Sequence, residues 1–212
     1  MIAHDVEQRS QEWYALRAGL PTASEFSKII TSKGEPSKSA EGYAVTLAIE
    51  LFTGGPVNDF GGSDYMERGR EMEAEALAFY EFTNGVSVTP VGFVTDDAKT
   101  MGCSPDGLVG DDGMCEVKCL KAENHVKAIL YHQKHGHLPP DYVQQTQGQL
   151  MICGRAWCDL IFYHPDIMPP LILRQTPNQP IFDALSREVP LLLAQRDSVL
   201  ASIHRHADRL AA

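Results

Sequence analysis

The chain has 212 residues, of which 43% are hydrophobic and 22% charged, and this composition predicts one globular domain with a sizeable core. No apolar run approaches the ~20 residues needed to cross a bilayer, and the first residues lack a secretory signal, so we expect a cytoplasmic protein without a membrane partner. The five cysteines include no CxxC pair, which argues against a disulfide framework and against a zinc site.

The net charge of −10 is unfavourable for binding nucleic acid, because neutralising phosphates provides most of that affinity. The charge is unevenly distributed, however. Residues 116–137 contain four lysines and two glutamates. Five further cations lie in the first fifth of the chain, at Arg9, Arg17, Lys28, Lys33 and Lys38. An acidic exterior with basic segments turned toward one channel is compatible with DNA binding, and a solvated basic surface is the alternative.

The first third of the chain is predicted to be helical. The pattern predicts helices over residues 10–18, from a cap at Thr22 or Ser24 through Ile30, over 40–52 and over 65–82. Glycines after the third and fourth helices, at Gly54 and Gly85, mark their ends.

The remainder of the chain alternates between strands and helices. Strands are expected at residues 86–95, 107–109, 114–120, 156–163 and 171–175. Helices are expected at 122–131, 142–153 and 179–210, with Pro190 as a break or kink in the last. This order predicts an α/β fold in which a mixed central sheet is flanked by helices.

A Pro-Asp turn is followed ten residues later by Glu-x-Lys. Asp106 lies in the turn, because Pro105 and Gly107 favour one, while residues 114–120 alternate as a strand does. On a period of two, Glu116 and Lys118 project from the same face of that strand. Two carboxylates and a lysine suit Mg²⁺ binding and phosphodiester chemistry. The alternative is an ordinary hairpin turn beside a solvated ion pair.

Two further stretches carry candidate functional residues. Residues 142–150 contain four glutamines, of which Gln145 and Gln149 lie on one helical face, although surface glutamine is the alternative for most of the four. Arg17 precedes Thr22 and Ser24 at a helix start, where guanidinium, hydroxyls and free N–H groups can bind an anion. A plain helix cap beside a structural arginine is the alternative.

Taken together, these motifs resemble the phage lambda exonuclease and YqaJ-type viral recombinase nucleases of the Pro-Asp/Glu-x-Lys superfamily. The resemblance extends over most of residues 10–165. The matching segments are WYALRAGLPTASE at 13–25, EFTNGVSVT at 81–89, CSPDGL at 103–108, EVK at 116–118 and YVQQTQ at 142–147. The segment GEPSKSAEGYAV differs from the basic loop expected over the DNA end, with Lys33 and Lys38 as the nearest replacements.

The resemblance implies a restriction-endonuclease-like core and a single nuclease domain over 1–212. Within it, residues 1–55 form the N-terminal helices with a 5′-phosphate pocket, 65–165 the catalytic core and 178–210 a C-terminal helix. The implied metal ligands are Asp106, Glu116 and the carbonyl of Val117, with Glu73 supporting a second metal through water. Lys118 is implied as the catalytic lysine and Gln145 as the active-site glutamine, with Gln147 as the alternative. The implied DNA contacts are Arg17, Thr22 and Ser24 at the 5′-phosphate and Met66 as an apolar wedge.

The implied activity is that of a Mg²⁺-dependent exonuclease, with Mn²⁺ as a substitute, in a bacterial or phage-infected cell. Members of this family form ring-shaped homotrimers on duplex DNA ends. They digest one strand from its 5′ end and leave a 3′ overhang for a single-strand annealing protein. An endonuclease of the same superfamily and a non-catalytic DNA-end-binding recombination module are the alternatives.

Overall fold

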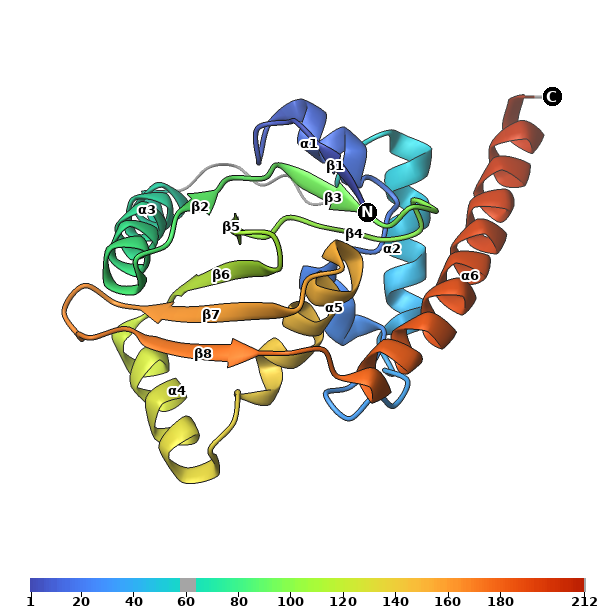
Figure 1. Ribbon diagram of the computed structural model, residues 1–212. Coiled ribbons are helices and arrows are strands. Elements are labelled where there is room, and N and C mark those ends of the chain that lie inside the picture. The colour runs from blue at the N-terminus through green and yellow to red at the C-terminus, as the bar shows by residue number, and fades with distance from the viewer. Residues whose placement is uncertain (58–63, 212) are drawn as a thin grey trace.

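The centre of the molecule is a five-stranded sheet with the strand order β2-β5-β6-β7-β8 (Figure 1). The computed structural model describes residues 1–57 and 64–211, with side chains over 1–57 and 71–209. The strands are Val88–Thr89 (β2), Gly107–Val109 (β5), Gly113–Cys119 (β6), Trp157–Tyr163 (β7) and Leu171–Gln175 (β8). β6 and β7 pair in parallel and the other neighbours pair antiparallel, which confirms the predicted mixed sheet.

A second, three-stranded sheet was not expected from the sequence. Its strands, in the order β1-β3-β4, are Ile2–His4 (β1), Phe93–Thr95 (β3) and Gly102–Cys103 (β4). The prediction of one strand over 86–95 is therefore wrong. Pro90 lacks an N–H group for a ladder, and at Gly92 an added Cβ would lie 1.9 Å from the carbonyl oxygen of Val6, so the chain passes closely under β1 and changes sheets.

The helices follow the predicted order with local differences. They are Gln11–Arg17 (α1), Ala40–Thr53 (α2), Asp64–Asn84 (α3), Ala122–His135 (α4), Val143–Cys153 (α5) and Gln179–Ala211 (α6). The segment after Thr22 is a 3₁₀ helix, Ala23–Lys28 (η1), and another short one, Pro140–Tyr142 (η2), precedes α5.

Two predicted helix boundaries are corrected by the structure. α4 continues past residue 131 to His135, where Gly136 takes the left-handed conformation that ends it. α6 runs through Pro190, so the expected break there is wrong. Val189 and Leu192 on either side of the proline are buried in the main core, and this packing holds the helix together.

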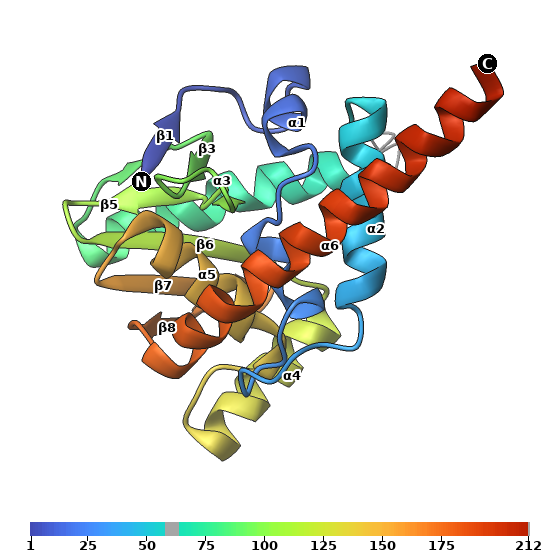
Figure 2. The ribbon, with the colours of Figure 1, turned by 90° about the vertical axis from the view of Figure 1, so that its right-hand side faces the viewer.

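Helices cover both faces of the central sheet. On one face α3 packs Ala76 and Tyr80 against β6 and β7, and on the other α5 packs with η1, α2 and α6 in the largest cluster of buried side chains. Figure 2 shows α6 crossing α2, with its C-terminal part extending beyond the rest of the molecule. In the part of the chain that the structure describes, no helix combines the length and apolarity that a membrane crossing requires.

Candidate active site

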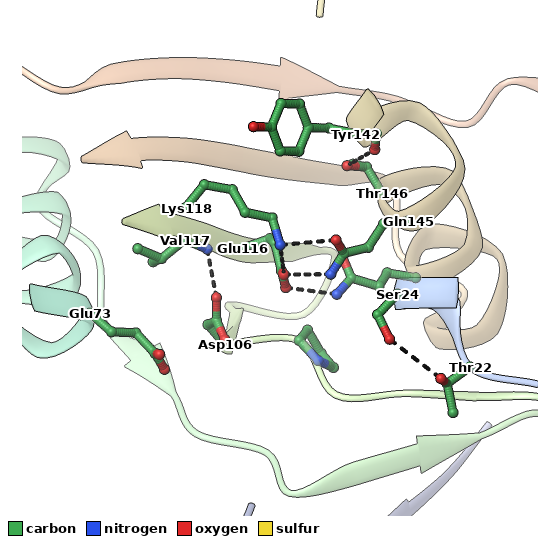
Figure 3. Close-up of polar contacts among 12 residues, drawn as sticks. Thr22, Ser24, Glu73, Asp106, Glu116, Val117, Lys118, Tyr142, Gln145 and Thr146 are labelled. Carbon is green, nitrogen blue, oxygen red and sulfur yellow. Dashed lines mark hydrogen bonds and ion pairs between the residues drawn. The ribbon is translucent and has the colours of Figure 1, made fainter. Parts of the chain in front are cut away.

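Strand β6 presents two chemically different faces. Cys115 and Val117 are buried against α3, whereas the side chains of Glu116 and Lys118 meet on the opposite face (Figure 3). There the Lys118 Nζ donates to Glu116 Oε1 at 2.8 Å. The structure thus confirms that these two residues share one face. The alternative of a solvated surface pair is wrong, because the side chain of Glu116 is only 6% exposed.

Asp106 lies in the loop that leads into β5. Its Oδ2 atom accepts a hydrogen bond from the backbone N–H of Val117 at 2.6 Å, which fixes the turn against β6. Glu116 follows on the neighbouring strand, since Gly107 pairs with Cys115 in the β5–β6 ladder. The predicted turn-and-strand arrangement therefore brings both carboxylates to one place.

Two glutamines of α5 hold the two oxygens of the Glu116 carboxylate. Gln145 Nε2 donates to Oε1 at 2.6 Å and Gln149 Nε2 donates to Oε2 at 2.7 Å. Gln145 Oε1 also accepts from Lys118 Nζ at 2.9 Å, so lysine, glutamate and glutamine form a closed hydrogen-bonded triangle (Figure 3). Sequence reasoning did not assign a role to Gln149, although the four-residue spacing from Gln145 was the signal that could have found it.

The interpretation of most of these glutamines as surface residues is wrong. Gln144, Gln147 and Gln149 are all buried. Gln147 points away from the carboxylates: it donates to the carbonyl of Thr176 at 2.9 Å and accepts from the N–H of Asn178 at 2.8 Å. Gln145, not Gln147, therefore contacts Glu116.

Burial and mutual repulsion shift the pKa values of the acidic groups. Burial raises the pKa of Asp106 well above its usual value, and the nearby Glu116 and Glu73 raise it further. Burial also raises the pKa of Glu73, against the opposing effect of Arg9. For Lys118, burial alone would lower the pKa, but the contacts with Glu116 and the proximity of Asp106 outweigh it and raise the pKa. The lysine therefore stays charged between carboxylates.

The donors present suit a hard divalent cation. No three His, Cys, Asp or Glu side chains converge into a complete metal site among the residues described. The carboxylates of Asp106 and Glu116 offer hard oxygens, and their crowding leaves negative charge that a cation would offset. This set fits Mg²⁺, which keeps several waters and binds protein through one or two carboxylates.

Glu73 reaches the site from α3. Figure 3 shows its side chain extending from that helix toward the Asp106 side of the cluster. Its Oε2 atom lies 3.5 Å from a terminal nitrogen of Arg9, an ion pair between two partly exposed side chains.

Arg17 lies in a neighbouring pocket built mainly by α1, η1 and α2. Its guanidinium stacks 4.0 Å from the ring centroid of Trp13, whose Nε1 donates to Ser104 Oγ at 2.8 Å. The Arg17 guanidinium also donates to Thr22 Oγ1 at 3.3 Å, and the Thr22 hydroxyl in turn contacts the Ser24 hydroxyl at 3.3 Å. The three predicted phosphate-binding residues are thus joined in one hydrogen-bonded chain.

Arg17 is a partly buried cation, with Glu25 and Glu50 near enough to act on its pKa but not to form an ion pair with it. Burial lowers its pKa, against weaker opposing effects led by Tyr43 and Glu25. No carboxylate of the described residues forms an ion pair with it. A desolvated guanidinium beside two hydroxyls is an arrangement that favours an anion.

The two predicted sites open into adjoining cavities. A cavity of about 330 Å³ is lined by Arg17, Thr22 and Ser24, with Lys28 at its wall. A second, of about 190 Å³, is lined by Asp106 and Glu116. Five residues line both cavities: Arg9, Trp13, Arg17, Thr22 and Ser24. The arginine pocket and the carboxylates therefore lie in two adjoining cavities with a shared wall, which together are called the depression.

Two predicted DNA contacts are not part of this depression. Lys33 and Lys38, the replacements proposed for a basic loop, line neither cavity. Met66 falls within α3, but its side chain lies outside the described residues.

Solved structures with a similar fold include exonucleases. An alkaline exonuclease from Laribacter hongkongensis, LHK-Exo, is 32% identical, with a TM-score of 0.80 over 95% of this chain and 100% of that one. The same enzyme in complex with dAMP gives a TM-score of 0.82 at 31% identity, over the same shares of the two chains. A phage-related exonuclease from Haemophilus somnus 129PT shares the fold at 15% identity, with a TM-score of 0.68 over 87% of this chain and 96% of that one.

The family assignment rests on the sequence as well as on the fold. No curated protein sequence matches the chain significantly. Residues 12–156, however, match the model of the YqaJ-like viral recombinase domain, and this span holds every residue of the carboxylate site and of the arginine pocket discussed above except Arg9. The chain therefore belongs to the YqaJ-like viral recombinase family.

Proposed function

We propose that the protein is a Mg²⁺-dependent exonuclease that digests one strand of linear duplex DNA from its 5′ end. The observation that carries the proposal is the depression shared by the Arg17 pocket and the carboxylates. A strand whose terminal phosphate occupies the pocket would place a nearby phosphodiester beside Asp106 and Glu116. Family membership and the alkaline exonuclease neighbours support a nuclease function.

The residues of the carboxylate site would divide the work of phosphodiester hydrolysis. Asp106, Glu116 and the Val117 carbonyl would hold Mg²⁺, with Glu73 acting through water, and the bound ions would supply an activated water and charge stabilisation at the leaving oxygen. Lys118, positioned by Glu116 and Gln145, would offset the negative charge that develops on the phosphate. Gln145 would orient the attacking water or the scissile phosphate.

The first experiment determines the direction of digestion. Linear duplexes labelled at either the 5′ or the 3′ end are incubated with the protein and Mg²⁺, and the 5′ label should be released first, leaving a 3′ overhang. Early release of the 3′ label would contradict the proposed polarity. Covalently closed circular DNA should remain intact, whereas cutting of the circle would indicate an endonuclease. No nucleotide release from any substrate would indicate a non-catalytic DNA-end-binding module.

The metal requirement is tested in the same assay. Mg²⁺ and Mn²⁺ should both support cleavage, because both accept oxygen ligands in octahedral geometry. Ca²⁺ should support binding without cleavage, since its larger and looser ligand shell misplaces the nucleophile. Full activity in Ca²⁺ would contradict the proposed mechanism.

We further propose a closed homotrimeric ring that delivers its product to a single-strand annealing protein. Light scattering should then report about three times the 23.4 kDa mass of the chain, because a heterologous contact closes into a ring. A monomer at working concentration would contradict the ring. Met66 would part the terminal base pairs, so Met66→Ala should slow duplex digestion more than single-strand digestion.

A further inference from the structure

Arg9 has a backbone conformation that favours glycine. Its φ angle is +70°, and Lys99, at +54°, is the one other non-glycine residue with a positive φ in the described part of the chain. Such conformations are uncommon for residues with a Cβ atom and are retained where the surrounding structure determines them. Lys99 lies in an exposed turn and lines neither cavity. Arg9, by contrast, lines both.

The residues on either side of Arg9 fix its position. Gln8 Nε2 donates to the carbonyls of Val91 at 2.9 Å and Pro105 at 3.2 Å, which ties this segment to the residue just before Asp106. On the other side, Ser10 caps α1 by accepting from the Trp13 N–H at 3.1 Å. The Arg9 backbone is thus held between the loop of the catalytic aspartate and the helix that carries Arg17.

The guanidinium of Arg9 has N–H donors that can form further hydrogen bonds. Its one hydrogen bond within the described residues goes to Glu73 at 3.5 Å, and its side chain is 40% exposed. A long contact between two partly exposed side chains is weak and readily exchanged. A guanidinium has five N–H donors in a fork that matches a phosphate.

The acidic residues around Arg9 would repel a DNA strand unless a cation lay beside its path. A strand that runs from the Arg17 pocket to the carboxylates must pass Asp106, Glu116 and Glu73, which repel phosphates. Lys118 is already paired with Glu116. Of the five residues that line both cavities, Arg9 and Arg17 are the two cations.

We propose that Arg9 is a second phosphate-binding residue, which contacts a backbone phosphate of the DNA strand between the Arg17 pocket and the carboxylates. This inference rests on the proposed function. In the free protein Glu73 holds the guanidinium, and in the complex the phosphate replaces Glu73 as its partner. The conformation at Arg9 is retained because it directs this side chain into the depression.

Binding measurements with three variants test the proposal. Arg9→Gly removes the guanidinium and suits the positive φ, so the fold should be retained. Lys99→Gly makes the same backbone change far from the cavities, and Arg9→Lys keeps the charge. Affinity for a hairpin duplex with one 5′-phosphorylated end is measured by fluorescence anisotropy in Ca²⁺ over a range of salt, with thermal unfolding to check folding.

Arg9→Gly should bind about tenfold more weakly, as expected for a lost charge-assisted hydrogen bond. The slope of log affinity against log salt should become less negative by about 0.9, the value for one duplex phosphate contact. Arg9→Lys should keep most of the wild-type slope, and Lys99→Gly should match the wild type in both quantities.

Three outcomes would overturn the inference. They are an unchanged salt slope in Arg9→Gly, an equal loss of affinity in Lys99→Gly, and a wild-type protein that does not bind the duplex. The proposed function is judged separately, by cleavage in Mg²⁺. A wild type that binds with the predicted dependence on Arg9 but releases no nucleotide would refute the exonuclease and leave Arg9 as a phosphate ligand.

Discussion

The two halves of the depression surround a partly buried cation in opposite ways. At the carboxylates, Lys118 is paired with Glu116 and its pKa is raised, although burial alone would lower it. In the neighbouring pocket, Arg17 has an aromatic ring and hydroxyls around it, and burial lowers its pKa. Lys118 is already compensated in the free protein, whereas Arg17 gains most when an anion arrives. Under the proposed function, this difference suits the first half to chemistry and the second to binding.

The largest expected effect is loss of the carboxylates or the lysine. Asp106→Ala, Glu116→Ala and Lys118→Ala should each reduce cleavage by ~10³-fold or more, because each removes a preorganised charge at the reacting phosphate. Single-turnover cleavage of a 5′-labelled duplex measures the loss. Binding of the 5′-phosphorylated end should be retained, since the Arg17 pocket is left intact.

Asp111→Ala is the matched control for these variants. Asp111 is an exposed acidic residue in the turn between β5 and β6, so its removal changes the net charge as Asp106→Ala and Glu116→Ala do, without touching the site. It should cleave at the wild-type rate. Retention of a tenth of wild-type activity in Asp106→Ala, Glu116→Ala or Lys118→Ala would contradict the assignment of that residue.

Loss of Arg17 should be the second largest effect and should depend on the DNA end. Arg17→Ala removes one charged hydrogen-bond partner, worth about 2 to 4 kcal/mol, so digestion of 5′-phosphorylated duplex should slow by roughly 30-fold to several hundredfold. Digestion of 5′-hydroxyl duplex, already slow in the wild type, should change little. Equal slowing on both ends, or a wild type that does not distinguish them, would make Arg17 a structural residue.

Substitutions at Gln149 and Gln147 should have different effects, the first mainly on cleavage and the second mainly on stability. Gln149→Leu leaves Glu116 Oε2 without its donor, so cleavage should fall about tenfold and half-maximal activity should require more Mg²⁺. Its stability should fall less than that of Gln147→Leu, because the substitution breaks one hydrogen bond rather than two and also removes the Gln149 Oε1 atom, a buried acceptor without a partner among the described residues.

Gln147→Leu should show the reverse pattern. It leaves Thr176 and Asn178 without their hydrogen-bond partner, which should lower the free energy of unfolding by about 1 to 3 kcal/mol without changing the cleavage rate of the folded enzyme. Urea unfolding and cleavage assays on both variants measure the contrast. Equal effects of the two substitutions on cleavage would refute a positioning role for Gln149.

The smallest expected effect lies at the floor of the arginine pocket. The Tyr43 hydroxyl accepts from the Thr22 N–H at 3.2 Å, so Tyr43→Phe leaves that donor unpaired next to the proposed phosphate site. The preference for 5′-phosphorylated over 5′-hydroxyl ends should fall roughly threefold, in line with one neutral hydrogen bond. An unchanged preference would show that the position of Thr22 does not depend on Tyr43.

Local patterns predicted much of the carboxylate site. The turn at Asp106 follows from its Pro and Gly neighbours, and the shared face of Glu116 and Lys118 follows from the two-residue period of a strand. Such signals are contained in a few consecutive residues. The convergence of Asp106 with Gln145 was expected only from the resemblance to known nucleases, because it depends on how distant segments pack.

The features missed by sequence reasoning depend on long-range packing. β1 pairs with β3 across about ninety positions, and no local pattern specifies that partner. The burial of Gln147 and Gln149 was missed because glutamine is a common surface residue, and only the packed helix shows which partners satisfy it. The positive φ of Arg9 was equally hidden, since nothing in its sequence neighbourhood requires it.

Helix α6 supports the segments that line the arginine pocket, all of which lie within residues 9–56. Ile181, Leu185 and Val189 of α6 lie in the core with η1 and α2, and Arg196 donates to the carbonyl of Gly19 at 2.7 Å. During synthesis, at about 5 to 20 residues per second, this support is therefore missing until residues 181–196 have left the ribosome. If the pocket binds DNA ends as proposed, nascent chains that lack α6 should bind them more weakly than the folded protein does.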